Sequence, residues 1–538
     1  MKFCFIATLI KIVIFINYNM LYAYKCGTDL IKKKPFKISN DKVNNNNRRR
    51  LSDEFTPIRI MVDYTSLSLR LDDSKLTFFK QVFSDVTKYF NSLLSVQHDN
   101  VALDANTIND NCGIDEIGSG FERWLYDNDV IIFPYIDDEF DDNVLAAASA
   151  CLILNDNKPV GGIVGINPSL SNDKIDSKIF IEMILMHELS HVLGFHPFFF
   201  EALNLITKET IDNKEYVYIN SEKVLEKAKI HFNCSEIKGI QLEDQGGEGS
   251  IRSHWEARYM LSDYMISTDY TEMVISDITL ALFEDTGFYK VNYYTGGLFR
   301  FGKNQGCSFL QEQCIKSEGN YIKTSFPNEF CFETRNPFCG SSHTSRGICS
   351  ISTYTEPIEA KYQYFSDSHI GGSFSSVNYC PVSYFSMFGD SNNMQYNYPN
   401  HCNYGYNMNS YYDEIIGGNS LCFESSLVPS NQNENGERSI CYKYECDKFK
   451  KEIIVKIGTN KVICPGERKE LINPDGFKGK IMCPEYNLVC SSEIQCNSMF
   501  DCINKKSTSI RNTYFYLFSF GLKVNLYFLY LIFILYLL

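Results

Sequence analysis

Residues 177–194 read SKIFIEMILMHELSHVLG, a mostly apolar run that ends in glycine. Its length and composition predict one long buried helix with Gly194 as its C-terminal cap. His187 and His191 lie four positions apart, so a helix presents both from one face, where they can chelate one ion. Glu188 stands beside them, placed to accept a proton from a water on that ion. The pentapeptide fits two ordinary helix histidines with local partners equally well.

Shorter patterned segments precede this helix and predict a compact α+β domain. PIRIMVDY (57–64) alternates as a strand, and residues 75–96 carry apolar side chains at helical spacing. DVIIFPYI (129–136) and KPVGGIVGIN (158–167) are short apolar strands bounded by turn residues. The predicted order is therefore strand, helix, strand, strand, helix, with the two histidines on the last element.

Composition divides the 538 residues into a leader, a body and a tail. The apolar start predicts a secretory signal peptide, with an N-terminal membrane anchor as the alternative. The next segment is polar and basic and ends in an asparagine run and three arginines, as expected of an exposed, cleavable propeptide. The predicted regions are 1–23 (signal), 24–50 (propeptide), 51–194 and 195–300 (two halves of a first unit), 301–505 (a cysteine-rich region of short strands and loops) and 506–538 (a hydrophobic tail).

Charge is distributed unevenly along the chain. The net charge is −14, but residues 1–50 hold eleven Lys/Arg against two Asp, so the remainder carries about −23. An acidic body of this kind argues against nucleic-acid binding.

Cysteine content points to an oxidising compartment. The chain has twenty cysteines, most of them between Cys307 and Cys502. Spacings such as that of Cys441 and Cys446 are not the C-x-x-C pairs of zinc ribbons. The cysteines therefore predict disulfides and a secretory route.

A catalytic zinc needs three protein ligands and a water, and the third ligand is not obvious. The extended motif H-E-x-x-H-x-x-G-x-x-H would place it at position 197, which is Pro197. His196 comes one residue early and is not expected to reach the face shared by the first two histidines. The candidates further along the chain are His231, His254, His343, His369 and His401.

HELSHVLGFHPFFF (187–200) resembles the active-site helix of leishmanolysins, metzincin zinc metalloproteases in which a long insertion separates the glycine from the third histidine. Residues 232–268, which include LEDQGGEGSIRSHWEARYMLSDYMIST, resemble the family's ENQGG…GSHWEKR stretch with its following methionine, and residues 275–293 resemble the helix that closes its catalytic half. The likeness spans roughly 51–500. It implies a metzincin-type catalytic domain with a split active site, followed by a disulfide-rich, mainly-β and loop C-terminal domain.

The resemblance also implies roles for single residues. It makes His254 in SHWE the third zinc ligand beside His187 and His191, Glu188 the general base, and Met265 in DYMIS the methionine of the turn beneath the metal. The implied cofactor is one Zn²⁺ per chain, and the implied substrates are the peptide bonds of proteins.

Two further stretches resemble the family in part. KPVGGIVGIN (158–167) resembles the edge strand against which a substrate pairs, with an ordinary core strand as the alternative, and His196 is expected at the surface or behind the ligands. YKCGTD (24–29) resembles the leader motif whose cysteine occupies the zinc, which makes Cys26 a candidate switch, although Tyr24 and Thr28 replace the two histidines of that motif. Cys26 in a disulfide or as a free thiol is the alternative. Setting aside Cys26 and the signal's cysteine leaves eighteen, enough for nine bridges.

The C-terminal tail predicts a membrane surface as a partner. Small residues at 507–509 precede an apolar segment from Val524 to the end, which is typical of a GPI attachment signal, with a spanning helix as the alternative. The sequence thus predicts a secreted or surface-anchored zinc endopeptidase. A non-catalytic surface adhesin or coat protein of the same fold is the competing hypothesis, and the oligomeric state is left open.

Overall fold

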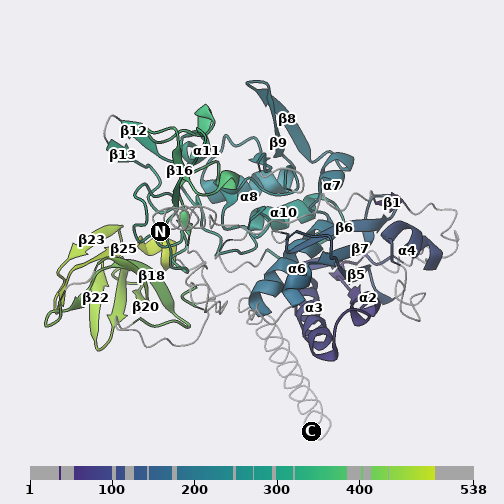
Figure 1. Ribbon diagram of the computed structural model, residues 1–538, viewed down its shortest axis with the longest axis horizontal. Coiled ribbons are helices and arrows are strands. Elements are labelled where there is room, and N and C mark those ends of the chain that lie inside the picture. Colours follow the sequence, from purple (N-terminus) through teal and green to yellow (C-terminus); the bar gives the residue numbers. More distant parts are fainter. Residues whose placement is uncertain are drawn as a thin grey trace, which may run out of the picture.

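A computed structural model gives the fold of the chain in three successive blocks (Figure 1). The described residues are 35–37, 54–99, 105–114, 127–141, 144–171, 178–245, 250–268, 270, 272–293, 298–318, 321–384, 401–403, 414–433 and 436–490. The predicted signal peptide, Cys26 with most of the propeptide, and the C-terminal tail lie outside them.

The first block is a five-stranded sheet with helices on both faces. Its elements and its close neighbours are β1 (Phe36–Lys37), β2 (Thr56–Pro57), β3 (Ile60–Val62), α2 (Thr65–Ser68), α3 (Asp73–Leu93), β4 (Leu94–Val96), α4 (Ala105–Cys112), β5 (Val130–Ile136), β6 (Ala146–Ile153), β7 (Pro159–Ile166), the 3₁₀ turn Pro168–Ser171 and α6 (Lys178–Leu193). The strand order is β1-β6-β7-β5-β3, and β6 runs antiparallel to β7 while the other pairs are parallel.

This sheet confirms most of the predicted elements and corrects one expectation. The predicted helix at 75–96, the strands at 129–136 and 158–167 and the helix at 177–194 are present within a few residues. The stretch at 158–167 is not an edge strand, because β7 is hydrogen-bonded to β5 on one side and to β6 on the other. The antiparallel strand beyond it, β6, did not figure in the predicted order of elements.

The two faces of the sheet are buried against different helices. α3 and α6 cover one face, where Val164, Ile132 and Leu189 belong to the main core. α4 covers the other face, where Ile108, Ile131 and Leu152 form a separate core and the Cys112–Cys151 disulfide joins α4 to β6. With both faces covered, the strands are apolar throughout rather than alternating.

The second block begins after Gly194, whose φ of +140° ends α6 as the sequence predicts. Residues between Gly194 and His254 form a helix, a hairpin that projects from the body and a second helix (Figure 1). The elements are α7 (Pro197–Ala202), β8 (Ile206–Ile211), β9 (Lys214–Ile219), α8 (Glu222–Phe232), β10 (Ile240–Gln241), α9 (Ala257–Met260), α10 (Asp277–Asp285) and β11 (Tyr289–Val291). α10 packs against α8, and β11 pairs with β4, so this block shares the main core with the first.

The third block is rich in short strands and disulfides. Its elements are α11 (Cys307–Gln311), β12 (Lys316–Glu318), β13 (Tyr321–Lys323), β14 (Ile348–Cys349), β15 (Ile351–Thr353), β16 (Ile370–Gly372), β17 (Ser383–Tyr384), β18 (Ser420–Ser425), β19 (Val428–Pro429), β20 (Arg438–Asp447), β21 (Glu452–Ile457), β22 (Asn460–Cys464), β23 (Lys469–Ile472), β24 (Phe477–Lys478), β25 (Lys480–Cys483), α12 (Tyr486–Val489) and two 3₁₀ turns at 360–362 and 375–377. Six of these strands make one antiparallel sheet with its own core around Phe423, Tyr442 and Val455.

Eight disulfides join the described cysteines, which confirms the predicted use of cysteine. They are Cys112–Cys151, Cys234–Cys307, Cys314–Cys380, Cys331–Cys349, Cys339–Cys422, Cys402–Cys441, Cys446–Cys490 and Cys464–Cys483. Cys496 and Cys502, the pair left for a ninth bridge, lie outside the described residues. Among the residues described, no helix combines the length and apolarity that crossing a bilayer requires.

Candidate metal centre

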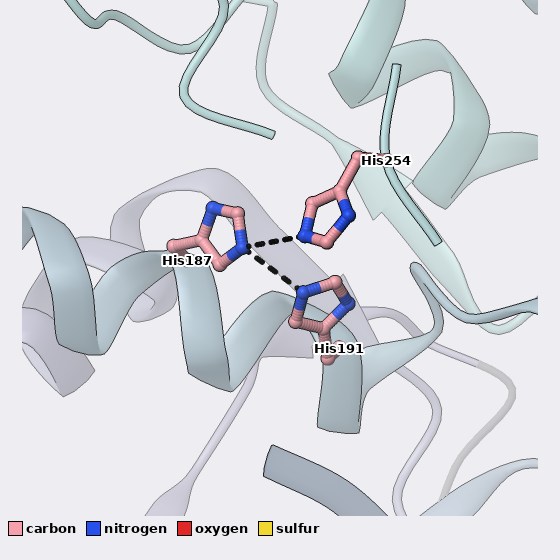
Figure 2. A group of neighbouring side chains, drawn as sticks. All are labelled: His187, His191 and His254. Carbon is pink, nitrogen blue, oxygen red and sulfur yellow. Dashed lines mark hydrogen bonds between the residues drawn. The ribbon is translucent and has the colours of Figure 1, made fainter. Parts of the chain in front are cut away.

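Three histidines from two distant parts of the chain meet at one point (Figure 2). His187 and His191 project from α6, and His254 comes from the segment that precedes α9. His187 Nε2 lies 3.1 Å from His254 Nε2 and 3.0 Å from His191 Nε2. The structure therefore brings together the two helix histidines and, of the five downstream candidates, His254.

Backbone carbonyl groups fix the orientation of each imidazole ring. His187 Nδ1 donates to Tyr264 O at 2.6 Å, His191 Nδ1 to Phe195 O at 2.7 Å and His254 Nδ1 to Ser250 O at 3.0 Å. A carbonyl oxygen only accepts, so each Nδ1 carries the proton and each Nε2 of a neutral ring presents a lone pair. The three lone pairs face one another.

The surroundings keep these imidazoles neutral. All three side chains are buried, and that burial lowers the pKa of His187 to about 4 and the pKa of His191 and His254 well below the ordinary 6.5. Metal ions bind the neutral imidazole, so the ligands need not lose a proton at neutral pH.

The donor set fits a zinc ion. Zn–N distances are about 2.1 Å, and two ligands at tetrahedral angles are then roughly 3.4 Å apart, close to the observed separations of 3.0 and 3.1 Å. Three lone pairs this close repel one another unless a cation lies among them. Three histidines also match the ligand count of a catalytic zinc, which leaves the fourth position for water.

His254 owes its position to the residue that follows it. Trp255 is fully buried, forms isolated bridges with Leu242 and Ile266, and donates from Nε1 to Thr279 Oγ1 at 2.7 Å. Its ring also packs edge-on against Phe195, with centroids 5.1 Å apart, directly behind α6. The indole thus ties the loop that carries His254 to the end of α6, which carries His187 and His191.

A second connection joins α6 to the turn that contains Met265. Ser190 Oγ lies 2.6 Å from the Tyr264 hydroxyl, and the Tyr264 carbonyl accepts from His187. Met265 itself is fully buried, its N–H donates to Asp263 and its carbonyl accepts from Trp255 N at 2.9 Å. The pattern H-E-x-x-H specifies no residue type at position 190. The contact of Ser190 with Tyr264 therefore could not be predicted from the motif.

The remaining candidates fall outside the three-histidine group. His196 caps the N-terminus of α7, where its Nδ1 accepts from Phe198 N at 3.1 Å. His231 stacks on Phe299, and His343 donates to the Cys422 carbonyl in the disulfide-rich block. His369 and His401 belong to that block as well. Glu188 is buried on α6, adjacent to His187.

A helix-borne histidine pair, completed by a third imidazole from beyond a long insertion and followed by a buried methionine turn, fits the metzincin class of metal centres. Comparison with known proteins agrees with this class. The family profile described as leishmanolysin matches residues 71–496, so this chain belongs to the leishmanolysin family.

Individual relatives are distant but extensive matches. A leishmanolysin homolog of Crithidia fasciculata is 26% identical over 368 residues, which cover 65% of this chain and 54% of that protein. A leishmanolysin of Leishmania donovani is 28% identical over 368 residues, covering 66% of this chain and 59% of that protein. A leishmanolysin-like peptidase of Drosophila melanogaster is 28% identical over 339 residues, covering 57% and 49%. The chain thus spans about half to three fifths of the length of these relatives.

Proposed function

We propose that this chain is a zinc-dependent endopeptidase that hydrolyses peptide bonds of proteins. The observation that carries the proposal is the convergence of three neutral imidazoles: His187 Nε2 lies 3.1 Å from His254 Nε2 and 3.0 Å from His191 Nε2, and the ligand atoms of all three lie within 4.8 Å of one another. Membership of the leishmanolysin family supports it, because relatives named leishmanolysin-like peptidase share this region.

The three imidazoles would hold one Zn²⁺ and leave its full positive charge uncompensated. A zinc ion in such a site lowers the pKa of a water toward about 7 and polarises the substrate carbonyl. Met265 would support the ligands from its buried turn, as the likeness to the family implies.

Glu188 would act as the general base and then as the general acid. It lies next to His187 on α6 and is buried, at 2% exposure, so its carboxylate is not fully hydrated. It would take the proton of the attacking water and pass it to the departing amine nitrogen, which becomes a neutral leaving group.

Replacing Glu188 by glutamine tests the proposal most directly. Glu188→Gln should retain about one zinc per chain and lose casein hydrolysis by at least 10²-fold, the lower range for a lost general base. Glu182→Gln is the matched control, because Glu182 is also buried on α6 but pairs with Lys178 at 2.9 Å. The control should keep both zinc and activity.

Replacing histidines tests the ligand set independently. His254→Ala should lower the zinc content, whereas His196→Ala should leave it unchanged, because His196 caps a helix outside the group. A wild-type chain without zinc and without chelator-sensitive casein hydrolysis would contradict the proposal and leave the adhesin or coat hypothesis.

The enzyme would act in the secretory pathway or outside the cell. Eight disulfides are typical of oxidising compartments. The GPI-type tail and the Cys26 switch remain predictions from the sequence, and release by a phospholipase and activation by a mercurial would test them.

A further inference from the structure

A second group of ligand atoms lies beside the loop that carries His254. Glu243, Asp244 and Glu256 each contribute one carboxylate oxygen, and these oxygens all lie within 4.8 Å of one another. Glu243 and Glu256 are fully buried, and the side chain of Asp244 is only 8% exposed. Three carboxylates in a buried space of this size are costly unless something compensates their charge.

Hydrogen bonds within the described part of the chain leave two of the six oxygens unused. Glu256 Oε2 and Asp244 Oδ1 are buried and accept no hydrogen bond there. Glu243 is better satisfied, because its oxygens accept from Gln245 N at 2.8 Å and from Ser267 Oγ at 3.0 Å. Glu256 therefore has a buried oxygen without a hydrogen bond on a carboxylate that lies within 4.8 Å of the carboxylates of Glu243 and Asp244.

Cationic side chains do not neutralise the cluster. Lys214 Nζ lies 3.0 Å from Asp244 Oδ2, and in the described residues it is the one ammonium or guanidinium that makes an ion pair with any of the three carboxylates. Arg258 is close in sequence, but its guanidinium lies over the rings of Phe309 and Phe330 and donates to backbone carbonyls. One ammonium group does not balance the charge of three carboxylates, so the cluster favours a bound cation.

We propose that Glu243, Asp244 and Glu256 bind a hard divalent cation, with Ca²⁺ as the ion expected in an oxidising, extracellular setting. Carboxylate oxygens prefer Ca²⁺ and Mg²⁺ to the softer transition metals. Ca²⁺ holds its oxygens at about 2.4 Å in irregular geometry, so oxygens as far as about 4.8 Å apart can touch one ion. Water and backbone carbonyls complete the shell, as in most calcium sites.

The cation site lies beside the segment that carries His254, so a bound cation would stabilise that segment. Glu243 N donates to the His254 carbonyl at 2.9 Å, Arg252 N donates to the Glu243 carbonyl at 2.8 Å, and Glu256 follows His254 by two residues. A cation would cross-link the segment that ends in Asp244 to the segment that follows His254. Its loss would loosen His254 and weaken zinc binding.

Calcium titration of the full-length protein tests this inference without reference to peptidase activity. Thermal unfolding is followed as CaCl₂ rises from about 10 μM to 10 mM at constant free Zn²⁺, which brackets the Kd of about 0.1–1 mM of extracellular calcium modules, and bound calcium is counted by mass spectrometry. We expect one Ca²⁺ per chain and a Tm rise of roughly 2–5 °C at a Ca²⁺ concentration 100-fold above the Kd.

Variants assign the effect to the cluster. Glu256→Gln and Asp244→Asn should each weaken Ca²⁺ binding at least about tenfold and abolish the Tm rise. Glu236→Gln, an exposed carboxylate in the same block, should change neither. If Glu256→Gln does not fold, Asp244→Asn decides, because Asp244 is the least buried of the three residues.

Two results would overturn the inference. One is a wild-type protein whose Tm and calcium content do not respond up to 10 mM CaCl₂, a concentration above the Kd range of weak extracellular sites. The other is Asp244→Asn protein that binds calcium as tightly as the wild type. Neither result bears on the zinc endopeptidase, whose test is Glu188→Gln.

Discussion

Replacing Gly162 by alanine should displace α6, the helix that carries His187 and His191. An added Cβ on this β7 residue would lie 2.2 Å from Val192 Cγ1, 2.7 Å from Cγ2 and 3.0 Å from Cβ of the same side chain. Carbon atoms in ordinary contact are about 3.5–4.0 Å apart, so α6 would have to retreat by roughly 1.3 Å or more. Rotation about χ1 of Val192 brings no relief, because its Cβ is crowded as well.

The perturbation should cost more activity than stability. Overpacking of a core costs about 1–3 kcal/mol of unfolding free energy. Val192 directly follows His191, so a shift of about 1 Å in α6 displaces a ligand, and a misplacement of that size can cost about 10²-fold in rate. We therefore expect kcat/KM for a peptide substrate to fall about 100-fold in Gly162→Ala, measured beside urea unfolding of the same protein.

Two further variants separate this cause from general damage to the sheet. In Gly161→Ala the three atoms nearest to the added Cβ belong to Leu152, at 3.0–3.3 Å rather than 2.2 Å and on a side chain outside α6, so this variant should leave kcat/KM within about twofold. Adding Val192→Ala to Gly162→Ala should recover a large part of the lost rate, as a double-mutant cycle measures. Wild-type kcat/KM in Gly162→Ala, or no recovery in the double variant, would refute the reasoning.

Three other outcomes follow from the structure. Thr279→Val should lower the unfolding free energy by about 2–3 kcal/mol in urea, because it strips the buried Trp255 Nε1 of its acceptor and Asp263 of a 2.7 Å donor; an unchanged midpoint would contradict this. Burial lowers the pKa of His401 from 6.5 to about 3. Between these pH values only the unfolded chain takes up this proton, so the free energy of unfolding should fall as pH falls, by up to about 1.4 kcal/mol per pH unit. In His401→Gln the free energy of unfolding should depend less on pH in this range. Removing the metal with 1,10-phenanthroline should lower the calorimetric Tm, since zinc held 1,000-fold above its Kd stabilises by about 4 kcal/mol, and an identical Tm would argue against a bound metal.

Helix α6 could be predicted from sequence because each of its signals is local. The apolar run is long enough for four turns, and Gly194 supplies the positive φ of +140° that ends it. The edge position expected for residues 158–167 was wrong, because strand order depends on pairing between distant segments. β7 lies between β5 and β6, and nothing within its eight residues reports this.

Strand β6 was missed for a different physical reason. Its sequence AAASACLI is rich in alanine, a residue with low β propensity. The sequence also lacks the alternation of polar and apolar residues that marks a half-buried strand. All eight of its residues are buried, with α6 on one face and α4 tied to it by the Cys112–Cys151 disulfide on the other. Small side chains suit a strand that is covered closely on both sides, but that requirement comes from tertiary packing.

The third histidine of the candidate metal centre could not be chosen from residue spacing alone. Five downstream histidines were open, and only the likeness to leishmanolysins selected His254. In the structure the choice depends on Trp255, which bridges Leu242 and Ile266 and packs on Phe195. These partners are spread over some seventy residues of chain. The position of His254 therefore cannot be predicted from the residues next to it in the sequence.

The hydrogen bonds that orient the three imidazole rings determine which substitutions should disturb this site. The proton on each Nδ1 is directed to a backbone carbonyl, those of Tyr264, Phe195 and Ser250, rather than to a side-chain carboxylate. No single substitution can delete such an acceptor, so the usual 10–100-fold loss from removing an outer partner has no simple equivalent here. The ring orientations instead follow the main-chain positions of three separate segments. We therefore expect the site to be most sensitive to substitution of the residues that pack those segments together. These are Trp255, which packs on Phe195, and Gly162, which packs against α6, and neither belongs to the three-histidine group.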